Sequence, residues 1–149
     1  MTSRKGNGRK VVCGDWQGDF PLREEFEDFS GKMRVFVIDC HEGPLGYTVR
    51  GREEKPKGEG YEFAAYSETT PHAALGRLRE KARRSMATRH LGRDRSMLHD
   101  TLTGRITSGG DQGALLVIDG IAIDVDELAR LLRTYEGSEF KLRIKDPLE

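Results

Sequence analysis

The clearest hydrophobic pattern in the chain lies between residues 71 and 91. Apolar residues recur there at the spacing of one helix face, which indicates an amphipathic helix. Thr70 is a good N-cap and Pro71 suits the first helical position, so we expect the helix to begin there and to end before Gly92. The predicted apolar stripe consists of Leu75, Leu78, Ala82 and Met86.

Three segments upstream of this helix are typical of β-strands, because they are rich in β-branched and aromatic residues. They span 33–40, 46–50 and 61–66, and short turns or the charged loop 52–58 separate them. Sequential strands joined in this way form an antiparallel meander whose apolar face needs a cover. The helix that follows them supplies that cover.

Two further patterns precede the meander. Apolar residues at helical spacing between 20 and 31, with Pro21 near the start, predict a short acidic helix. Val11 and Val12 predict a short strand before it.

The chain beyond the long helix predicts a second, smaller unit. Asp119-Gly120 is a strong two-residue hairpin signal between apolar segments. Asp124 is suited to cap a second helix, because a glutamate follows three residues later, and Gly137 is suited to end it. Residues 97–102 predict a helical turn. The predicted strands of this unit are 104–107, 114–118, 121–123 and the alternating apolar and basic segment 140–145.

These elements predict an α+β protein. A three-stranded antiparallel meander covered by one long helix is followed by a hairpin-helix-strand unit. A length of 149 residues suits one domain or two small lobes that share a core. The expected organisation is a disordered basic tail at 1–10, an N-terminal lobe at 11–91, a linker at 92–100 and a C-terminal lobe at 101–149.

The chain has 25 Lys and Arg residues against 25 Asp and Glu residues, so its formal net charge is zero although 34% of its residues are charged. The charge lies in blocks: 15–28 is acidic, and 77–95 is basic. No apolar run approaches the roughly 20 residues of a membrane span, and no apolar segment follows the basic N-terminus as in a secretory signal. We therefore expect a cytoplasmic protein without membrane association, with Cys13 and Cys40 reduced.

The residue pattern does not favour catalysis or a cofactor. Metal sites need His, Cys, Asp or Glu at ligand spacing, and the four histidines are dispersed without a CxxC or HxxxH motif. The sequence also contains no GxSxG elbow and no P-loop. Cys40, His41 and His99 are the candidates for a small enzyme, which is the least favoured alternative. We expect no cofactor and a protein that acts by binding.

The basic side of the long helix is the main candidate for a functional surface. Arg suits phosphate because its planar fork donates two hydrogen bonds at once, and several such contacts give salt-dependent affinity for nucleic acid. An acidic protein is the alternative partner, whereas a solvated face or pairing with the acidic block needs no external partner. A self-associating assembly protein, a homo-oligomer built through the segment 139–145, is a further alternative. The candidate binding residues are Arg77, Lys81, Arg84, Arg83 and Arg89.

Two stretches carry a resemblance to known sequences: GYEFAAYSETTPHAALGRLREKARRSMATRHL and LLVIDGIAIDVDELARLLRTYEG. Together they resemble a group of small bacterial proteins known only as a domain of unknown function, over about two-thirds of the chain. This resemblance implies no activity and no catalytic residues. The order of three strands followed by a helix with the pattern ETTPHAAL is similar in architecture to HicB-type antitoxin domains and to double-stranded-RNA-binding domains. That likeness favours a binding function.

Overall fold

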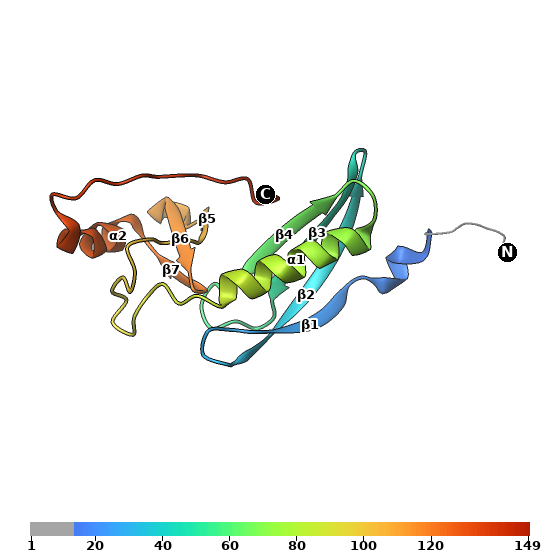
Figure 1. The fold of residues 1–149 in the computed structure, drawn as a ribbon, viewed down its shortest axis with the longest axis horizontal. Helices are drawn as coiled ribbons and strands as arrows, with labels where there is room; N and C mark the ends of the chain where they lie inside the picture. The colour runs from blue at the N-terminus through green and yellow to red at the C-terminus, as the bar shows by residue number, and fades with distance from the viewer. Residues whose placement is uncertain (1–13) are drawn as a thin grey trace.

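The computed structural model describes residues 14–149 as two lobes joined end to end (Figure 1). It confirms the α+β class, while the arrangement differs in detail from the expected one. The expected tail at 1–10 and the strand at Val11 and Val12 lie outside the described residues. The first lobe contains β1 (Leu22–Glu27), β2 (Met33–Gly43), β3 (Gly46–Glu53), β4 (Glu62–Ser67) and α1 (Pro71–Met86). The second lobe contains β5 (Arg105–Ser108), β6 (Ala114–Ile118), β7 (Ile121–Ile123) and α2 (Val125–Leu131). Short 3₁₀ helices lie at Gly14–Asp19, Gly110–Gln112 and Leu132–Tyr135.

The first lobe is a four-stranded antiparallel sheet in the order β1-β2-β3-β4, with α1 lying across one face. Phe36, Ile38 and Val49 from the two central strands are fully buried under α1. The opposite face carries charged side chains such as Arg50, whose Nη1 lies 3.1 Å from a carboxylate oxygen of Glu62. Because strand side chains alternate between faces, one covered face and one charged face follow from the sequence.

The helix predicted at 20–31 is wrong, because strand β1 lies there. All six of its residues pair with β2, so the meander has four strands and not three. Phe26 is 2% exposed beneath α1, whereas Glu25 and Glu27 face solvent. Positions i and i+4 share a face in a strand as well as in a helix, so the segment LREEFE fits both periods. Pairing with the free edge of β2 decides between them.

Helix α1 begins as predicted and ends early. The Thr70 side chain accepts a hydrogen bond of 3.0 Å from the backbone N–H of Ala73, and Pro71 follows the cap. The last helical residue is Met86, although the pattern predicted a helix up to Gly92. The chain leaves the helix so that Leu91, which is 2% exposed, can pack in the core of the second lobe. A tertiary contact therefore overrides the local helical pattern.

The second lobe confirms the strands expected around 104–107, 114–118 and 121–123, in the order β5-β6-β7. Asp119 and Gly120 have φ values of 55° and 80°, as a type I′ hairpin turn requires. Asp124 caps α2 through a bond of 2.7 Å from the backbone N–H of Glu127. The helical turn predicted at 97–102 is wrong, because this segment contains no helix.

The strand predicted at 140–145 is also wrong. Residues 138–149 contain no strand and run as an extended segment from α2 back towards the first lobe (Figure 1). Gly137, with φ of +91°, lies where the chain turns away from the second sheet. The last unit is therefore a three-stranded sheet with one short helix, followed by a segment that pairs with neither sheet.

The hairpin turn of the second lobe also joins the two lobes. The backbone N–H of Gly60 donates to the carbonyl oxygen of Gly120 at 2.9 Å. One carboxylate oxygen of Asp119 accepts the backbone N–H groups of His90 and Leu91, each at 2.8 Å. The other oxygen lies 3.0 Å from the His90 ring. The Asp119-Gly120 turn therefore forms hydrogen bonds both with the first lobe and with the segment that connects the two lobes.

Replacing Leu78 tests the packing of α1 on the sheet. This residue is 0% exposed, so the Leu78→Ala variant should lose about 2–5 kcal/mol of unfolding free energy through lost burial and the cavity left behind. Leu45→Ala removes the same atoms from a side chain that is 80% exposed and should change stability by less than about 0.5 kcal/mol. Urea denaturation measures both. Equal losses in the two variants would contradict the assigned core.

Candidate functional site

The cations of α1 border its buried stripe on two sides and do not form one face that points away from the sheet. Arg77, Lys81 and Arg84 follow one another on the side next to β4. Arg79 and Arg83 lie on the side next to β1. The long side chains of Arg77, Arg79 and Lys81 therefore reach from the helix to the rims of the sheet.

Two cations on the β4 side bind backbone carbonyls of that strand. Arg77 donates from Nη1 to the carbonyl oxygen of Tyr66 at 2.7 Å. Lys81 donates from Nζ to the carbonyl oxygen of Ala64 at 3.0 Å. Strand β4 is an edge of the sheet, and an edge strand presents unpaired carbonyls that can recruit another strand. These side chains therefore close part of the β4 edge.

The cations on the β1 side are occupied by this chain's own groups. Arg79 forms a two-pronged ion pair with Glu24, with N–O distances of 2.6 and 2.9 Å. The guanidinium of Arg83 lies over the Phe26 ring, 5.9 Å from its centre. On this side, the basic helix therefore pairs with the acidic block through Arg79 and Glu24.

Cations from the C-terminal segment come close to the β4 side of α1. Lys81 donates a second bond of 2.6 Å to the carbonyl oxygen of Pro147. Burial lowers the pKa of the Lys81 ammonium, and the positive charge of Lys145 lowers that pKa further, while Asp146 and Glu149 act in the opposite direction. Arg84 is exposed and has no hydrogen-bond or ion-pair partner among the described residues.

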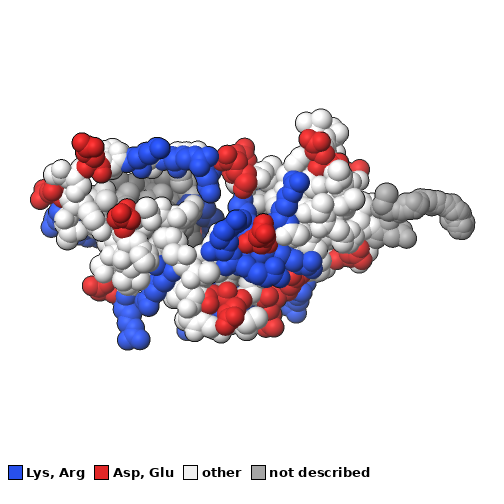
Figure 2. Space-filling model, viewed as in Figure 1, with Lys and Arg blue, Asp and Glu red and all other residues white. Residues whose placement is uncertain are grey.

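We call Arg77, Lys81, Arg84 and Lys145 the basic surface. Figure 2 shows Lys and Arg side chains gathered over α1 and along the C-terminal segment, with acidic side chains between them. Lys145 was not among the predicted binding residues. Its alternation in the segment 140–145 was the only signal in the sequence, and that pattern predicted a strand.

Arg89 lies apart from the basic surface, at the junction of the lobes. Its Nε donates to the carbonyl oxygen of Leu91 at 2.8 Å, and its guanidinium lies 5.4 Å from the centre of the Phe29 ring. It lines an open hollow of about 610 Å³ together with Ser30 and His99, among other residues. Of the five predicted binding residues, three therefore share one surface, and Arg83 and Arg89 lie elsewhere.

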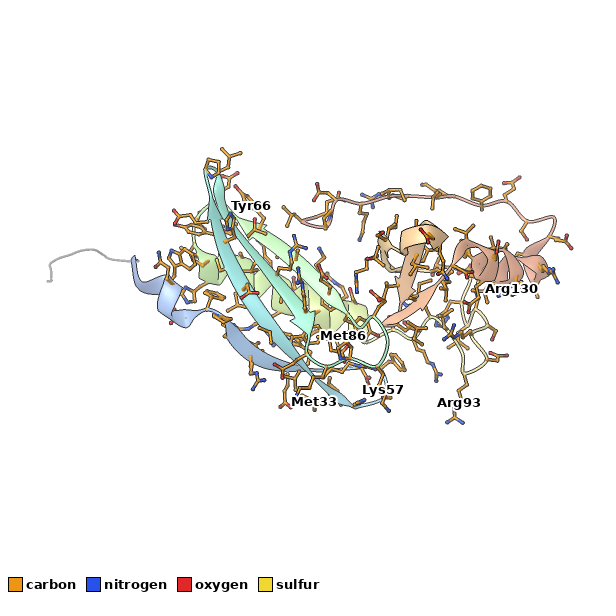
Figure 3. All side chains as sticks on the ribbon, turned by 180° about the vertical axis from the view of Figure 1, so that it is seen from behind. Met33, Lys57, Tyr66, Met86, Arg93 and Arg130 are labelled. Atoms are coloured by element: carbon orange, nitrogen blue, oxygen red, sulfur yellow. The ribbon has the colours of Figure 1, made fainter. Side chains whose placement is uncertain are left out.

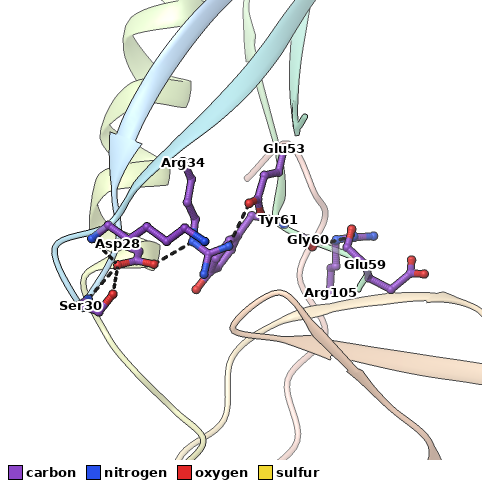
Figure 4. A network of polar contacts seen from close by, with 9 residues as sticks. Asp28, Ser30, Arg34, Glu53, Glu59, Gly60, Tyr61 and Arg105 are labelled. Carbon is purple, nitrogen blue, oxygen red and sulfur yellow. Dashed lines mark hydrogen bonds and ion pairs between the residues drawn. The ribbon is translucent and has the colours of Figure 1, made fainter. Parts of the chain in front are cut away.

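A polar network closes the end of the first sheet that faces the second lobe (Figure 4). Arg34 donates to Asp28 at 2.8 Å and to Glu53 at 2.9 Å, and its guanidinium lies 5.3 Å from the centre of the Tyr61 ring. Glu53 also accepts the backbone N–H of Tyr61 at 3.2 Å. Both carboxylates thus have matched donors, which indicates a structural brace and not an acid–base pair.

The same end of the sheet meets the second lobe through Arg105. Its Nη2 donates to the carbonyl oxygen of Gly60 at 3.0 Å, while its Nε and the Tyr61 hydroxyl are buried without a hydrogen-bond partner among the described residues. Burial raises the pKa of the Tyr61 hydroxyl above its ordinary value.

The structure does not bring together the three residues considered for catalysis. Cys40 and His41 are neighbours on β2, so their side chains point to opposite faces. Burial, followed by the charge of Glu42, raises the pKa of the Cys40 thiol, which disfavours the nucleophilic thiolate. His99 lines the hollow at the lobe junction. Residues 14–149 contain no group of three or more His, Cys, Asp or Glu placed to hold a metal ion, and no helix there could cross a membrane.

The brace predicts a pH dependence of stability. The Asp28 side chain is 1% exposed; burial alone would raise its pKa, but hydrogen bonds from Ser30, Arg34 and the backbone lower it to about 2. Because the folded pKa lies below the unfolded value of 3.8, this stabilisation is present above pH 4 and is lost as the pH falls through 2. It amounts to roughly 2 kcal/mol.

Denaturant unfolding at a series of pH values between 5 and 2 measures this contribution. The wild type should lose about 2 kcal/mol more than Asp28→Asn across this range, and the variant should be less stable at neutral pH because Arg34 keeps only one carboxylate. Asp111→Asn, at an exposed loop position, controls for the loss of one carboxylate. Parallel pH curves for the wild type and Asp28→Asn would contradict the role of Asp28.

Comparison with known proteins gives two family matches and no functional one. Residues 18–87 match a domain of unknown function, DUF7686, and residues 87–149 match a second one, DUF7713. No curated protein and no solved structure matches the chain. The likeness to HicB-type antitoxin and double-stranded-RNA-binding domains stays a prediction. The two matches meet directly after α1, so the chain matches two families of unknown function, one over each lobe.

Proposed function

We propose that this protein is a non-enzymatic binding module and that its basic surface contacts the phosphate backbone of a nucleic acid. The observation that carries the proposal is the approach of the C-terminal segment to α1: Lys81 donates to the carbonyl oxygen of Pro147 at 2.6 Å, which brings Lys145 to the side of α1 that carries Lys81 and Arg84. Cations gathered on one surface attract an anionic partner. Such a module would act in the cytoplasm.

The free donors of this surface are suited to phosphate. Arg84 has no hydrogen-bond or ion-pair partner among the described residues, and Arg77 donates to Tyr66 from Nη1, which leaves Nη2 for a ligand. These two residues are seven positions apart on one helix, a separation of about 10 Å. Guanidinium groups along a line fit the regular phosphates of a nucleic acid strand, and each donates two hydrogen bonds at once.

The acidic block of this chain does not neutralise the basic surface. Glu24 is paired with Arg79 at the other border of α1, and β1 lies at the opposite edge of the sheet from β4. The alternative in which the acidic block neutralises the cations of the helix therefore applies to Arg79 and not to Arg84. An acidic protein remains the competing partner, and the experiment below separates the two.

Fluorescence anisotropy with labelled single-stranded and duplex RNA and DNA, over a series of salt concentrations, tests the proposal. The logarithm of the affinity should fall linearly with the logarithm of the salt concentration, and Arg84→Ala should weaken binding and reduce the slope by about one. Arg52→Ala is the matched control, because it removes the same charge from the open face of the sheet, where the Arg52 side chain is 71% exposed.

The control variant should bind as the wild type does. Poly-glutamate of equal charge serves as the acidic-protein competitor and should displace the nucleic acid only weakly. Absence of binding at low salt, an equal loss for Arg52→Ala and Arg84→Ala, or tighter binding of poly-glutamate would each refute the proposal.

A further inference from the structure

The C-terminal segment exposes a complete strand pattern. Phe140, Leu142 and Ile144 are 91%, 77% and 67% exposed, and Lys141 and Arg143 alternate with them. Figure 3 shows the side chains of this segment standing clear of the two lobes. Soluble proteins rarely leave an alternating apolar row of this kind open, and such a row marks an interaction site. Its extended backbone is also free to pair with the edge of a sheet.

The free edges of the two sheets differ in what they can accept. The β4 edge is partly closed by Arg77 and Lys81, which bind its carbonyls. In the second sheet, β7 has only three residues, and Ile121 and Ala122 face the loop 57–59 across a small hollow. The other outer strand of that sheet, β5, has four residues. Strand β1 has six residues and pairs with β2 on one side only.

Strand β1 also matches the segment in charge. Glu25 and Glu27 are exposed on the open face of the sheet and have no partner among the described residues. The side chains of Lys141 and Arg143 have the same spacing of two residues and the opposite charge. If these pairs share the open face, the apolar row falls on the other face, beside Phe26 and the border of α1.

The chain's own β1 is out of reach of this segment. Lys81 holds Pro147 beside β4, and β1 is the opposite edge of the same sheet. In Figure 1 the C-terminal segment runs above the second lobe and ends near β4, while β1 lies on the far side of α1. An acceptor strand with this charge pattern must therefore come from another molecule.

We infer that the segment 139–145 adds as a strand to β1 of a second copy of this chain, with Lys141 and Arg143 beside Glu25 and Glu27 of that copy. Reciprocal exchange of the two segments gives a symmetric dimer. This inference shares Lys145 with the proposed nucleic-acid surface, but the two are tested at different residues, because Arg84 lies on α1 and Glu25 and Glu27 lie on β1.

Charge reversal with rescue tests the inference. Sedimentation velocity over a wide concentration range measures the dimer dissociation constant of the full chain. The double variant Glu25→Lys, Glu27→Lys should raise this constant by at least about 10-fold, because two attractive cross-strand pairs become repulsive. Adding Lys141→Glu and Arg143→Glu to the same chain should restore it to within about 3-fold of the wild type.

The double variant Glu59→Lys, Glu68→Lys makes the same charge change at exposed positions outside β1 and should leave the dimer intact. Thermal unfolding checks that each variant still folds. A wild type that is monomeric at every concentration would overturn the inference. So would a dimer that is insensitive to Glu25 and Glu27, or a four-residue variant without rescue.

Discussion

The packing of one helix across four strands determines how the rest of this structure is arranged. The apolar stripe of α1 lies on Phe36, Ile38 and Val49, and all three are fully buried. Gly51 allows this contact, because a Cβ there would lie 3.3 Å from Ile38 and 3.6 Å from Leu78. With the centre of the helix fixed at this depth, its flanking residues can only lie along the rims of the sheet. The cations on those rims follow from this geometry.

The cations on the two sides of α1 have different kinds of partner. On one rim, Arg79 and Arg83 are held by Glu24 and by the Phe26 ring. On the other rim, Arg77 and Lys81 bind backbone carbonyls, which satisfies a hydrogen bond but does not cancel the positive charge. The β4 side therefore keeps the charges of Arg77, Lys81 and Arg84, beside Asp146 and Glu149 of the C-terminal segment, whereas a carboxylate on α1's other side is paired with Arg79. That asymmetry is the physical basis for placing a ligand there.

The sequence predicted the elements whose signals are local. The Thr70 cap, the Asp119-Gly120 turn and the Asp124 cap were each identified correctly, because every one depends on a few neighbouring residues. Errors arose where distant contacts decide the outcome. The segment LREEFE satisfied two periods at once, and only its pairing with β2 made it a strand. The end of α1 depended on Leu91 entering a core formed by residues about 30 positions further along the chain.

The candidate site was predictable in part for the same reason. Arg77, Lys81 and Arg84 share a side of one helix, and helical spacing alone places them together. Lys145 could not be added to them without knowing where the C-terminal segment runs. Arg83 and Arg89 were grouped with the others by closeness in the sequence, but Arg83 faces β1, and Arg89 lies beyond the last turn of α1.

The partial closure of β4 limits how many neighbours one molecule can have. With that edge occupied by its own helix, the first sheet offers one acceptor strand, and each chain carries one donor segment. Two such chains that exchange segments with each other satisfy every donor and acceptor and stop there. If each chain instead donates its segment to one neighbour and accepts a segment from another, the same donor segment and acceptor strand build an open filament. The choice between a closed pair and a fibre would then depend on the length and path of the connection at 136–138.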